Sequence, residues 1–172
     1  DELRNDPAQD YTSGLSPYLH FGQISPLTIA LAALERTDIP RESFLEELVV
    51  RRELSFNFTW YDEDYDSLGC LPRWARETLR VHEQDYRDPS YTLEQLEAAQ
   101  THDPYWNAAQ RELLYTGAMH GYMRMYWGKK ILEWTPSVED AFDRTLYLNN
   151  KYALDGRDPN SYAGIAWCFG KH

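Results

Sequence analysis

The sequence predicts an all-α domain of about seven or eight helices. Apolar residues recur at helical spacing along most of the chain, and these stretches start at Ser, Thr, Asp or Pro and stop at Gly or before Pro. No alternating run of polar and apolar residues with a hairpin turn separates them, which argues against strands. At 172 residues the chain suits one domain with a sizeable core, without internal repeats.

The first predicted helices follow two Ser-Pro pairs. Residues 1–14 carry turn formers and no periodicity, which indicates a loop. Ser16 and Ser25 each precede a proline, so each hydroxyl is expected to cap a helix that begins at that proline. The second of these helices, PLTIALAALER, should end before Pro40.

The other predicted helices follow one another with short connections. In order they are ESFLEELVVRRELSFNFTW (42–60), LPRWARETLRVHEQD (71–85), TLEQLEAAQ (92–100), HDPYWNAAQRELLYTG (102–117), AMHGYMRMYWGKKILEW (118–134), SVEDAFDRTLYLNNKYAL (137–154) and DPNSYAGIAWCFG (158–170). Thr92, with the Glu and Gln residues after it, forms a capping signal. This succession of capped stretches supports the all-α prediction.

Charge and composition exclude several classes of protein. The net charge of −11 argues against the broad basic surface of most nucleic-acid binders, so any DNA contact must be local. The acidity indicates either an ordinary solvated face or adaptation to salt. No stretch is long and apolar enough to span a membrane, and the charged amino terminus is unlike a signal peptide. We therefore expect a soluble, intracellular, cytoplasmic protein without a membrane partner.

Neither a metal site nor a disulfide framework is expected. Cys70 and Cys168 form no CxxC pair and have no His at zinc-ligand spacing, so both are predicted to be core thiols. The chain also lacks GxGxxG after a strand, GxxxxGK[ST] and HExxH. Nucleotide, dinucleotide and zinc enzymes of the common kinds thereby lose support.

Two stretches have alternative interpretations as sites. TSGLS, residues 12–16, places hydroxyls and successive backbone N–H groups before a Pro-initiated helix. It is either a pyrophosphate site, because helix N-termini attract anions, or a simple capped turn. Glu47 and Arg51 at i, i+4 form either a structural ion pair or part of a charged site.

The stretch MHGYMRMYW, residues 119–127, is rich in Met and aromatic side chains. On a helix His120, Arg124 and Trp127 share one face. A buried Arg needs a carboxylate, and the turn at Asp155 supplies one. By itself such a stripe is more often core than cofactor wall.

Gly121 and Gly128 shift that balance towards a cofactor wall. A glycine inside a helix costs up to about 1 kcal/mol relative to Ala and usually marks something packed very close. Met119 and Met123 are expected to be plain core residues.

Three longer segments together resemble the flavin-binding helical domain of DNA photolyases, specifically of class II cyclobutane pyrimidine dimer photolyases. The segments are RNDPAQDYTSGLSPYLHFGQISP (4–26), THDPYWNAAQRELLYTGAMHGYMRMYWGKKILEW (101–134) and NNKYALDGRDPNSYAGIAW (149–167). The resemblance covers almost the whole chain, in order. It implies FAD bound in a folded-back shape, and light-driven repair of pyrimidine dimers in damaged DNA by electron transfer from reduced, excited FAD.

The resemblance also implies which residues hold the cofactor. The residues that wrap the FAD phosphates would be Thr12, Ser13, Gly14, Leu15 and Ser16. Arg124 and Asp155 would form an ion pair beside the isoalloxazine ring, and Asn149 would face flavin N5. Further cofactor contacts would come from Phe44 and Gly121, while Asp158 and Asn160 are either cofactor contacts or helix caps.

For the substrate, Glu47 resembles the acid that hydrogen-bonds the flipped dimer, and Met125 and Trp167 resemble its apolar walls. Photolyases are among the known enzymes that take bases out of the stack. By resemblance the candidate contacts to the DNA backbone are Arg4, Arg51, Arg52, Lys129 and Lys130.

Three of the six tryptophans would carry electrons from the surface to oxidised flavin. Trp127 would lie nearest the flavin, Trp106 would follow, and Trp134 would be outermost. Trp60 and Trp74 have no such role and are expected in the core.

Members of this family carry an amino-terminal α/β domain, which can hold a second, antenna chromophore, and further sequence at the carboxyl end. Residues 1–172 are therefore expected to be a partial, monomeric C-terminal FAD-binding domain. A cryptochrome-like light sensor and a helical domain without flavin are the alternatives. Glu47, Met125 and Trp167 favour repair over the light sensor. The residues expected to contact the flavin argue against a helical domain without flavin.

Overall fold

The protein is all-α, as the sequence predicts. The computed structural model describes residues 2–9, 11–38 and 40–171, and none of these forms a strand. The longer helices are α2 (Pro26–Glu35), α4 (Arg52–Tyr61), α5 (Arg73–Val81), α7 (Pro104–Thr116), α8 (Gly121–Trp134), α9 (Val138–Tyr152) and α10 (Pro159–Cys168). The shorter segments are η1 (Glu2–Asn5), α1 (Ser16–His20), α3 (Glu42–Leu45), η2 (Glu46–Arg51), η3 (Leu68–Cys70) and α6 (Leu93–Glu97).

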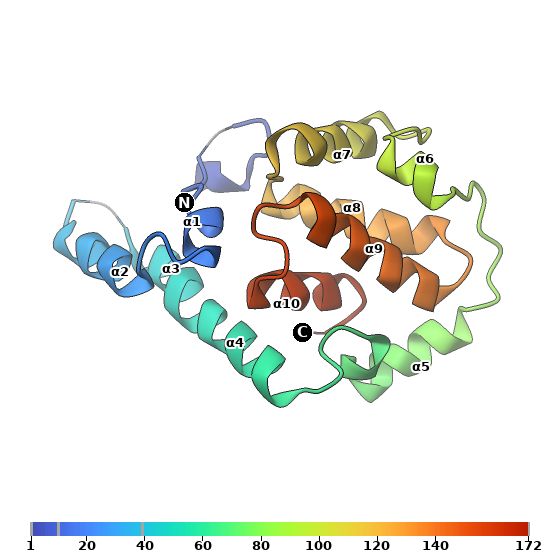
Figure 1. The fold of residues 1–172 in the computed structure, drawn as a ribbon, viewed down its shortest axis with the longest axis horizontal. Coiled ribbons are helices and arrows are strands. Elements are labelled where there is room, and N and C mark those ends of the chain that lie inside the picture. Colours follow the sequence, from blue (N-terminus) through green and yellow to red (C-terminus); the bar gives the residue numbers. More distant parts are fainter. Residues whose placement is uncertain (1, 10, 39, 172) are drawn as a thin grey trace.

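Helices α8, α9 and α10 form the centre of the molecule, with α7 beside α8 (Figure 1). α10 packs against α4, α8 and α9. Being surrounded in this way, α10 buries Ile165, Ala166 and Cys168. The amino-terminal α1 lies on the side of this centre that also faces α3 and α4 (Figure 1).

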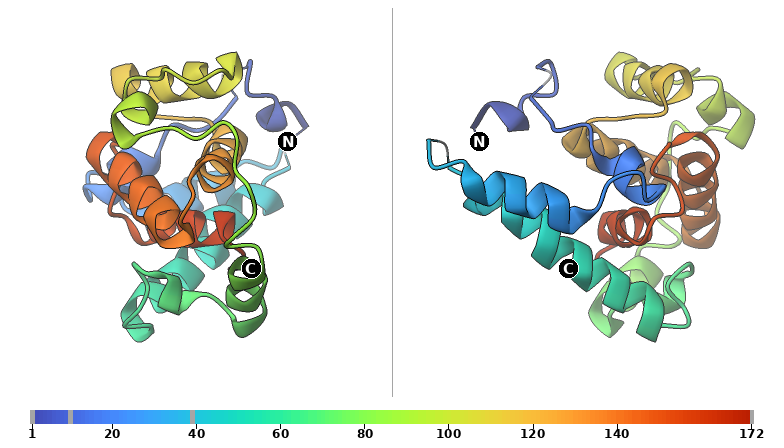
Figure 2. Two further views of the ribbon diagram at one scale, coloured as in Figure 1. Left: turned by 90° about the vertical axis from the view of Figure 1, so that its right-hand side faces the viewer. Right: turned by 60° about the vertical axis from the view of Figure 1, so that its left-hand side comes forward.

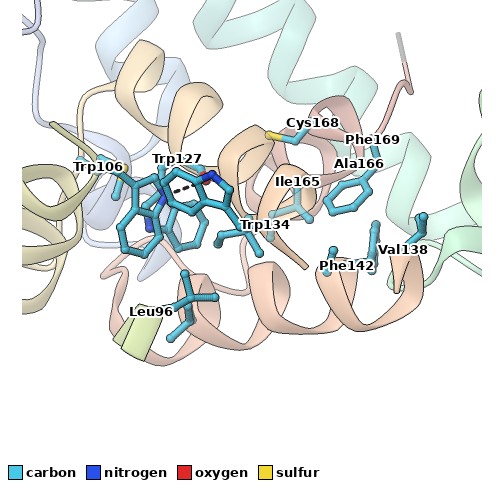
Figure 3. Close-up of a cluster of buried hydrophobic side chains, with 14 of the residues drawn as sticks. Leu96, Trp106, Trp127, Trp134, Val138, Phe142, Ile165, Ala166, Cys168 and Phe169 are labelled. Atoms are coloured by element: carbon cyan, nitrogen blue, oxygen red, sulfur yellow. Dashed lines mark hydrogen bonds between the residues drawn. The ribbon is translucent and has the colours of Figure 1, made fainter. Parts of the chain in front are cut away.

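Three indole rings form one end of the core. Trp106, Trp127 and Trp134 are at most 2 % exposed, and Figure 3 shows them gathered together, with Phe142 and Phe169 at the other end. Aromatic side chains bury about 150–250 Å² each, so these rings supply much of the hydrophobic stabilisation of the domain. Met119 lies in the same core and Met123 packs against it, as predicted.

Segments α3, η2 and α4 form one continuous helix over 42–61, which confirms the helix predicted for 42–60. Its middle part, η2, is a π-helix, and α2 lies alongside it (Figure 2). A π-turn brings residue i+5 under residue i, whereas an α-turn brings i+4. Arg51 therefore pairs with Glu46, at 3.7 Å, and the predicted pairing of Arg51 with Glu47 is wrong.

Most predicted helix starts are confirmed by side-chain caps. The side chains that accept a hydrogen bond from a backbone N–H of the first turn are Ser25, Thr92, Asp103, Ser137 and Asp158, and Thr92 completes the predicted capping box. Ser16, although predicted as a cap, does not cap its helix. Leu15 occupies the N-cap position of α1, in a helical conformation and without a side-chain hydrogen bond.

The cysteine prediction is confirmed and the prediction for two tryptophans is wrong. Cys70 and Cys168 are buried and unpaired, and burial raises the pKa of each thiol to about 11. Trp60 and Trp74 are not core residues, because they are 82 % and 53 % exposed on the outer faces of α4 and α5. None of the described helices is long and apolar enough to cross a lipid bilayer.

Candidate functional site

An ion pair links α8 to the turn that precedes α10. Arg124 Nη2 lies 3.0 Å from Asp155 Oδ1, and the two side chains are 17 % and 20 % exposed. The turn is held by the backbone N–H of Leu154, which donates to the carbonyl of Gly117 between α7 and α8. A side chain at Gly156 would meet the carbonyl oxygens of Ala153 and Asn149 at 2.8 and 2.9 Å, so the turn requires glycine there. The predicted pair of Arg124 and Asp155 is thus formed by the fold itself.

The amide of Asn149, near the end of α9, is fully buried and held in one orientation. Its Nδ2 donates to Ser161 Oγ on α10 and to Asn150 Oδ1. Asn149 is 1 % exposed and Ser161 is 5 % exposed. In this hydrogen-bond network the Oδ1 of Asn149 is the group that remains to accept a further bond. Ser161 is a functional candidate that sequence reasoning missed.

The segment Thr12–Ser16 runs exposed into α1. Gly14 adopts φ +62°, a conformation that favours glycine. Among the described residues, no protein group accepts a hydrogen bond from the backbone N–H of Ser13 or Gly14, while the N–H of Leu15 donates to Ser13 Oγ at 3.5 Å. The hydroxyls of this segment and the N–H groups of Ser13 and Gly14 are therefore available for further hydrogen bonds.

Asp158 joins α1 to the start of α10. Its Oδ1 accepts from the backbone N–H of Asn160 as the N-cap of α10, and its Oδ2 lies 3.4 Å from His20 Nδ1. Asn160 Nδ2 also donates to Asp158. The structure thus gives both residues capping contacts, and it brings the amino-terminal segment next to α10.

The amino-terminal η1 is tied to the start of α8. His120 Nε2 donates to the carbonyl of Arg4 at 2.8 Å, and Nδ1 accepts from the N–H of Tyr122 as the N-cap of α8. One tautomer, with the proton on Nε2, satisfies both bonds. The cap role of His120 was not predicted, because His is an uncommon N-cap residue.

The three core indoles form a row. The rings of Trp127 and Trp106 are nearly parallel with centroids 6.2 Å apart, and Trp106 and Trp134 meet edge to face at 5.6 Å. Trp106 Nε1 donates to the carbonyl of Trp127, and Trp127 Nε1 donates to the buried Oε1 of Gln110 (Figure 3 draws the indoles). The contact order matches the predicted order Trp127, Trp106, Trp134. Trp134 is 2 % exposed, so the outer member of the row is itself buried.

Trp167 and Met125 lie on neighbouring helices, α10 and α8. Trp167 is 47 % exposed and lines a hollow of about 290 Å³ together with Trp74 and Lys129. Met125 is half-buried and its Sδ lies 3.9 Å from Cys168 Sγ. Neither this hollow nor a larger one of about 460 Å³ beside α4 is lined by the residues predicted to hold the flavin.

Other predicted site residues are less closely connected. Glu47, in the π-segment, is exposed, and no hydrogen bond or ion pair to another described residue engages its carboxylate. Phe44 is half-buried on α3. Gly121 begins α8, and a Cβ there would meet nothing within 4 Å, so close packing against protein does not explain it. At Gly128 a Cβ would lie 2.7 Å from Cys168 Sγ, which confirms close packing there.

The candidate DNA-contacting cations differ in their engagement. Arg51 pairs with Glu46, and Lys130 pairs with Glu133 at 2.8 Å. Arg52 lies 3.8 Å from a carboxylate oxygen of Glu53 and over the ring of Phe56, and its side chain is 16 % exposed. Lys129 is exposed, and no described acidic residue pairs with it. The carbonyl of Arg4 accepts a hydrogen bond from His120, and Arg4 has a further interaction within the protein.

Fold and site together define an all-α domain in which a row of buried indole rings lies beside a half-buried Arg–Asp ion pair. No protein-family model matches the chain. Several curated proteins, in contrast, are similar to the chain along most of its length. The chain is 61 % identical, over its whole length, to a deoxyribodipyrimidine photo-lyase of Methanothermobacter thermautotrophicus. It is 55 % and 50 % identical, over 95 % of its length, to proteins of the same name from Oryza sativa subsp. japonica and Potorous tridactylus.

The chain belongs to the photolyase family. It spans 38 % of the archaeal relative and 33 % and 31 % of the plant and marsupial relatives. The likeness therefore concerns one segment of a photolyase, and this segment is the all-α unit described above.

Proposed function

We propose that this chain is the FAD-binding catalytic part of a class II photolyase, which repairs cyclobutane pyrimidine dimers in DNA when illuminated. The identity of 50–61 % to photo-lyases along nearly the whole chain carries the proposal. The Arg124–Asp155 pair, the amide of Asn149 and the indole row support it, because they give an electron-transfer cofactor a charge partner, a hydrogen-bond partner and a donor.

The residues present fit FAD. Thr12 to Ser16 offer hydroxyls for a pyrophosphate, and the backbone N–H groups of Ser13 and Gly14 donate to no described residue. Arg124 engages Asp155 through Nη2, which leaves other guanidinium donors for a ligand. When bound and reduced, FAD supplies the light-driven electron transfer that splits the dimer.

The residues around Arg124 set the charge at the ring. Asp155 holds the guanidinium in place, and a fixed positive charge in a half-buried site stabilises an anionic ligand more than it would in water. Ser161 fixes Asn149 so that the amide Oδ1 is left to accept a hydrogen bond. This orientation suits a ring nitrogen that carries a proton.

Met125 and Trp167 provide apolar surface for the flipped dimer, and Glu47 provides an acid. Flipping a damaged base costs a few kcal/mol, and burying it against Trp and Met offsets this cost. Glu47 is free to reach a ligand, because no described residue engages its carboxylate. Its proton would be donated to, or shared with, a base carbonyl oxygen.

The DNA backbone would be held by few cations. Lys129 is the strongest candidate, since it is exposed, unpaired among the described residues and beside the hollow that Trp167 lines. Arg4, Arg51, Arg52 and Lys130 already have intramolecular contacts, which DNA would have to displace or share. A small number of phosphate contacts is consistent with a net charge of −11.

The row of Trp127, Trp106 and Trp134 would deliver an electron to oxidised cofactor before repair begins. Ring centroids 5.6–6.2 Å apart make each step short. The complete protein would act as a monomer on damaged DNA, and a second, antenna chromophore would belong to the part outside this chain.

The test uses the full-length protein. Bound flavin is measured by its absorbance, and dimers are then counted in irradiated DNA after illumination, with a dark sample as control. Light-dependent loss of dimers supports repair. Flavin bound with no loss of dimers would sink the repair proposal and leave a light sensor that uses the same tryptophan row. Absence of flavin would remove both.

A further inference from the structure

A buried glutamine lies in the apolar core beside the indole row. Gln110 is 0 % exposed, and it lies one helical turn after Trp106 and one before Leu113 on the core-facing side of α7. Burying an amide costs free energy unless hydrogen bonds replace its contacts with water. An apolar side chain of similar size could fill the same space, so the hydrogen bonds of Gln110 are what distinguish it.

Two neighbours hold the amide of Gln110 in one orientation. Its Oε1 accepts from Trp127 Nε1 at 2.8 Å, and its Nε2 donates to the carbonyl of Glu97 at 3.3 Å. Because an indole N–H only donates and a carbonyl only accepts, a rotated amide would lose both bonds. Glu97 ends α6, where helix carbonyls have no intrahelical partner, and Lys151 on α9 binds its carboxylate. The amide oxygen is therefore fixed on the N–H of Trp127.

The acceptor of this N–H determines what happens to the proton when Trp127 is oxidised. Loss of one electron makes an indole N–H a much stronger acid, and a base or water beside it then takes the proton. The deprotonated radical accepts an electron from the next indole less readily, because the N–H bond has to be re-formed. Trp127 is 1 % exposed, and the amide oxygen of Gln110 is a very weak base, so the proton stays on the indole.

The same hydrogen bond favours removal of an electron from Trp127. A hydrogen bond with a charged donor is about twice as strong as one between neutral groups, so the amide stabilises the oxidised indole more than the neutral one. The effect is strengthened in a core that excludes water. Trp106, whose ring is stacked 6.2 Å away, donates its own Nε1–H to the carbonyl of Trp127, another very weak base.

We propose that Gln110 is a positioning residue for electron transfer, which makes Trp127 easier to oxidise and keeps the indole proton in place. One electron leaves Trp127 for the photoexcited, oxidised flavin, and the Trp127 radical cation keeps its N–H proton in the bond to Gln110. One electron from Trp106 then restores neutral Trp127, and no proton moves in either step. The inference rests on the proposed function, because the flavin is the oxidant.

The test uses full-length, flavin-loaded protein after a laser flash. Gln110→Leu has no hydrogen-bond acceptor in the side chain, so photoreduction of the flavin should slow about three- to tenfold. Gln110→Glu keeps an oxygen that accepts from Trp127, whether the carboxyl group is neutral or ionised, so photoreduction should be at least as fast as in the wild type. In the wild type, the first tryptophan radical should have the spectrum of the protonated cation, and its rate of formation should be the same in heavy water.

Thr145→Val is the matched control. Thr145 is also 0 % exposed, and its hydroxyl donates to the carbonyl of Ala141, so the variant removes a buried hydrogen bond that involves no indole. It should be photoreduced as fast as the wild type. Equal rates in Gln110→Leu and Thr145→Val would overturn the proposal. A deprotonated tryptophan radical formed first in the wild type, or slower formation in heavy water, would overturn it as well.

A measurement in the dark separates this inference from the proposed function. With isotopically labelled indole nitrogens, the N–H signal that disappears in Trp127→Phe belongs to Trp127. Its hydrogen bond should shift this signal downfield, and Gln110→Leu should move it upfield, whereas Thr145→Val should leave it in place. No shift in Gln110→Leu would refute the role of the amide, whatever the flavin does. Photoreduction that is equally fast in Gln110→Leu and the wild type would refute this inference alone and leave the proposed function intact.

Discussion

Replacing Gly128 by alanine should destabilise the protein, because the added methyl group has no room. Its Cβ would lie 2.7 Å from Cys168 Sγ and 3.3 Å from Cys168 Cβ. Favourable contacts between carbon atoms lie at about 3.5–4.0 Å, so the overlap with sulfur is about 1 Å. Cys168 is 7 % exposed and its sulfur already contacts Met125 and the carbonyl of Gly164, which prevents its retreat.

Overpacking of this kind costs about 1–3 kcal/mol, and the gain in helix propensity from Gly to Ala returns up to about 1 kcal/mol. The net loss should be about 1 kcal/mol, which lowers Tm by about 2–4 °C for a domain of this size. The assay is thermal unfolding of the full-length protein, followed by near-ultraviolet circular dichroism of the buried indoles.

Two variants sharpen this test. In flavin-free protein, Gly121→Ala adds a Cβ that meets no protein atom within 4 Å, so it should be neutral or slightly stabilising. In a Cys168→Ala background, Gly128→Ala should cost much less stability, because the overlapping sulfur is gone and only the 3.3 Å contact with the Cβ of residue 168 remains. If Gly128→Ala and Gly121→Ala shifted Tm equally, or if the Cys168 background changed nothing, the steric argument would be refuted.

Three further predictions concern the site and its surroundings. Trp127→Phe should slow photoreduction of bound flavin by about tenfold or more, while pre-reduced protein still repairs dimers; equal loss of both would contradict the electron-donor role. Arg124→Ala, which leaves Asp155 half-buried without its partner, should release more flavin on gel filtration than Asp155→Asn, and the reverse order would count against the charge argument. Burial, and then the hydrogen bond to Asp103, raises the pKa of Tyr126 to about 12. Stability from this group is present below about pH 10 and lost as pH rises towards 12, by about 1–3 kcal/mol; urea unfolding against pH should lose this dependence in Tyr126→Phe.

Helix positions follow from the sequence where the signal is local. Ser25, Thr92 and Asp158 cap their own helices through N–H groups two or three residues away, so the sequence alone predicts them. Ser16 carries the same Ser-Pro signal as Ser25 yet does not cap α1, because Leu15 already has helical dihedral angles there. A cap depends on how the chain enters the helix, and this is set by packing.

The π-segment shows a second limit. Apolar residues between 42 and 60 follow a helical pattern that tolerates one extra residue, so the pattern predicts a helix without revealing η2. The consequence is local but chemical. Arg51 turns towards Glu46, and no described residue engages the carboxylate of Glu47, which suits its proposed contact with a ligand.

The tryptophans show why burial is harder to predict than helix position. Helical spacing places Trp127 and Trp134 on the same α8, but what covers Trp134 comes from segments far away in the sequence, through Tyr91 and His102. No pattern within α8 reveals these two rings. Helical spacing alone therefore does not predict that Trp134, at the outer end of the indole row, is buried. The closure changes the chemistry as well as the burial. A covered indole meets other rings rather than water, so Tyr91 and His102 set the surroundings of Trp134.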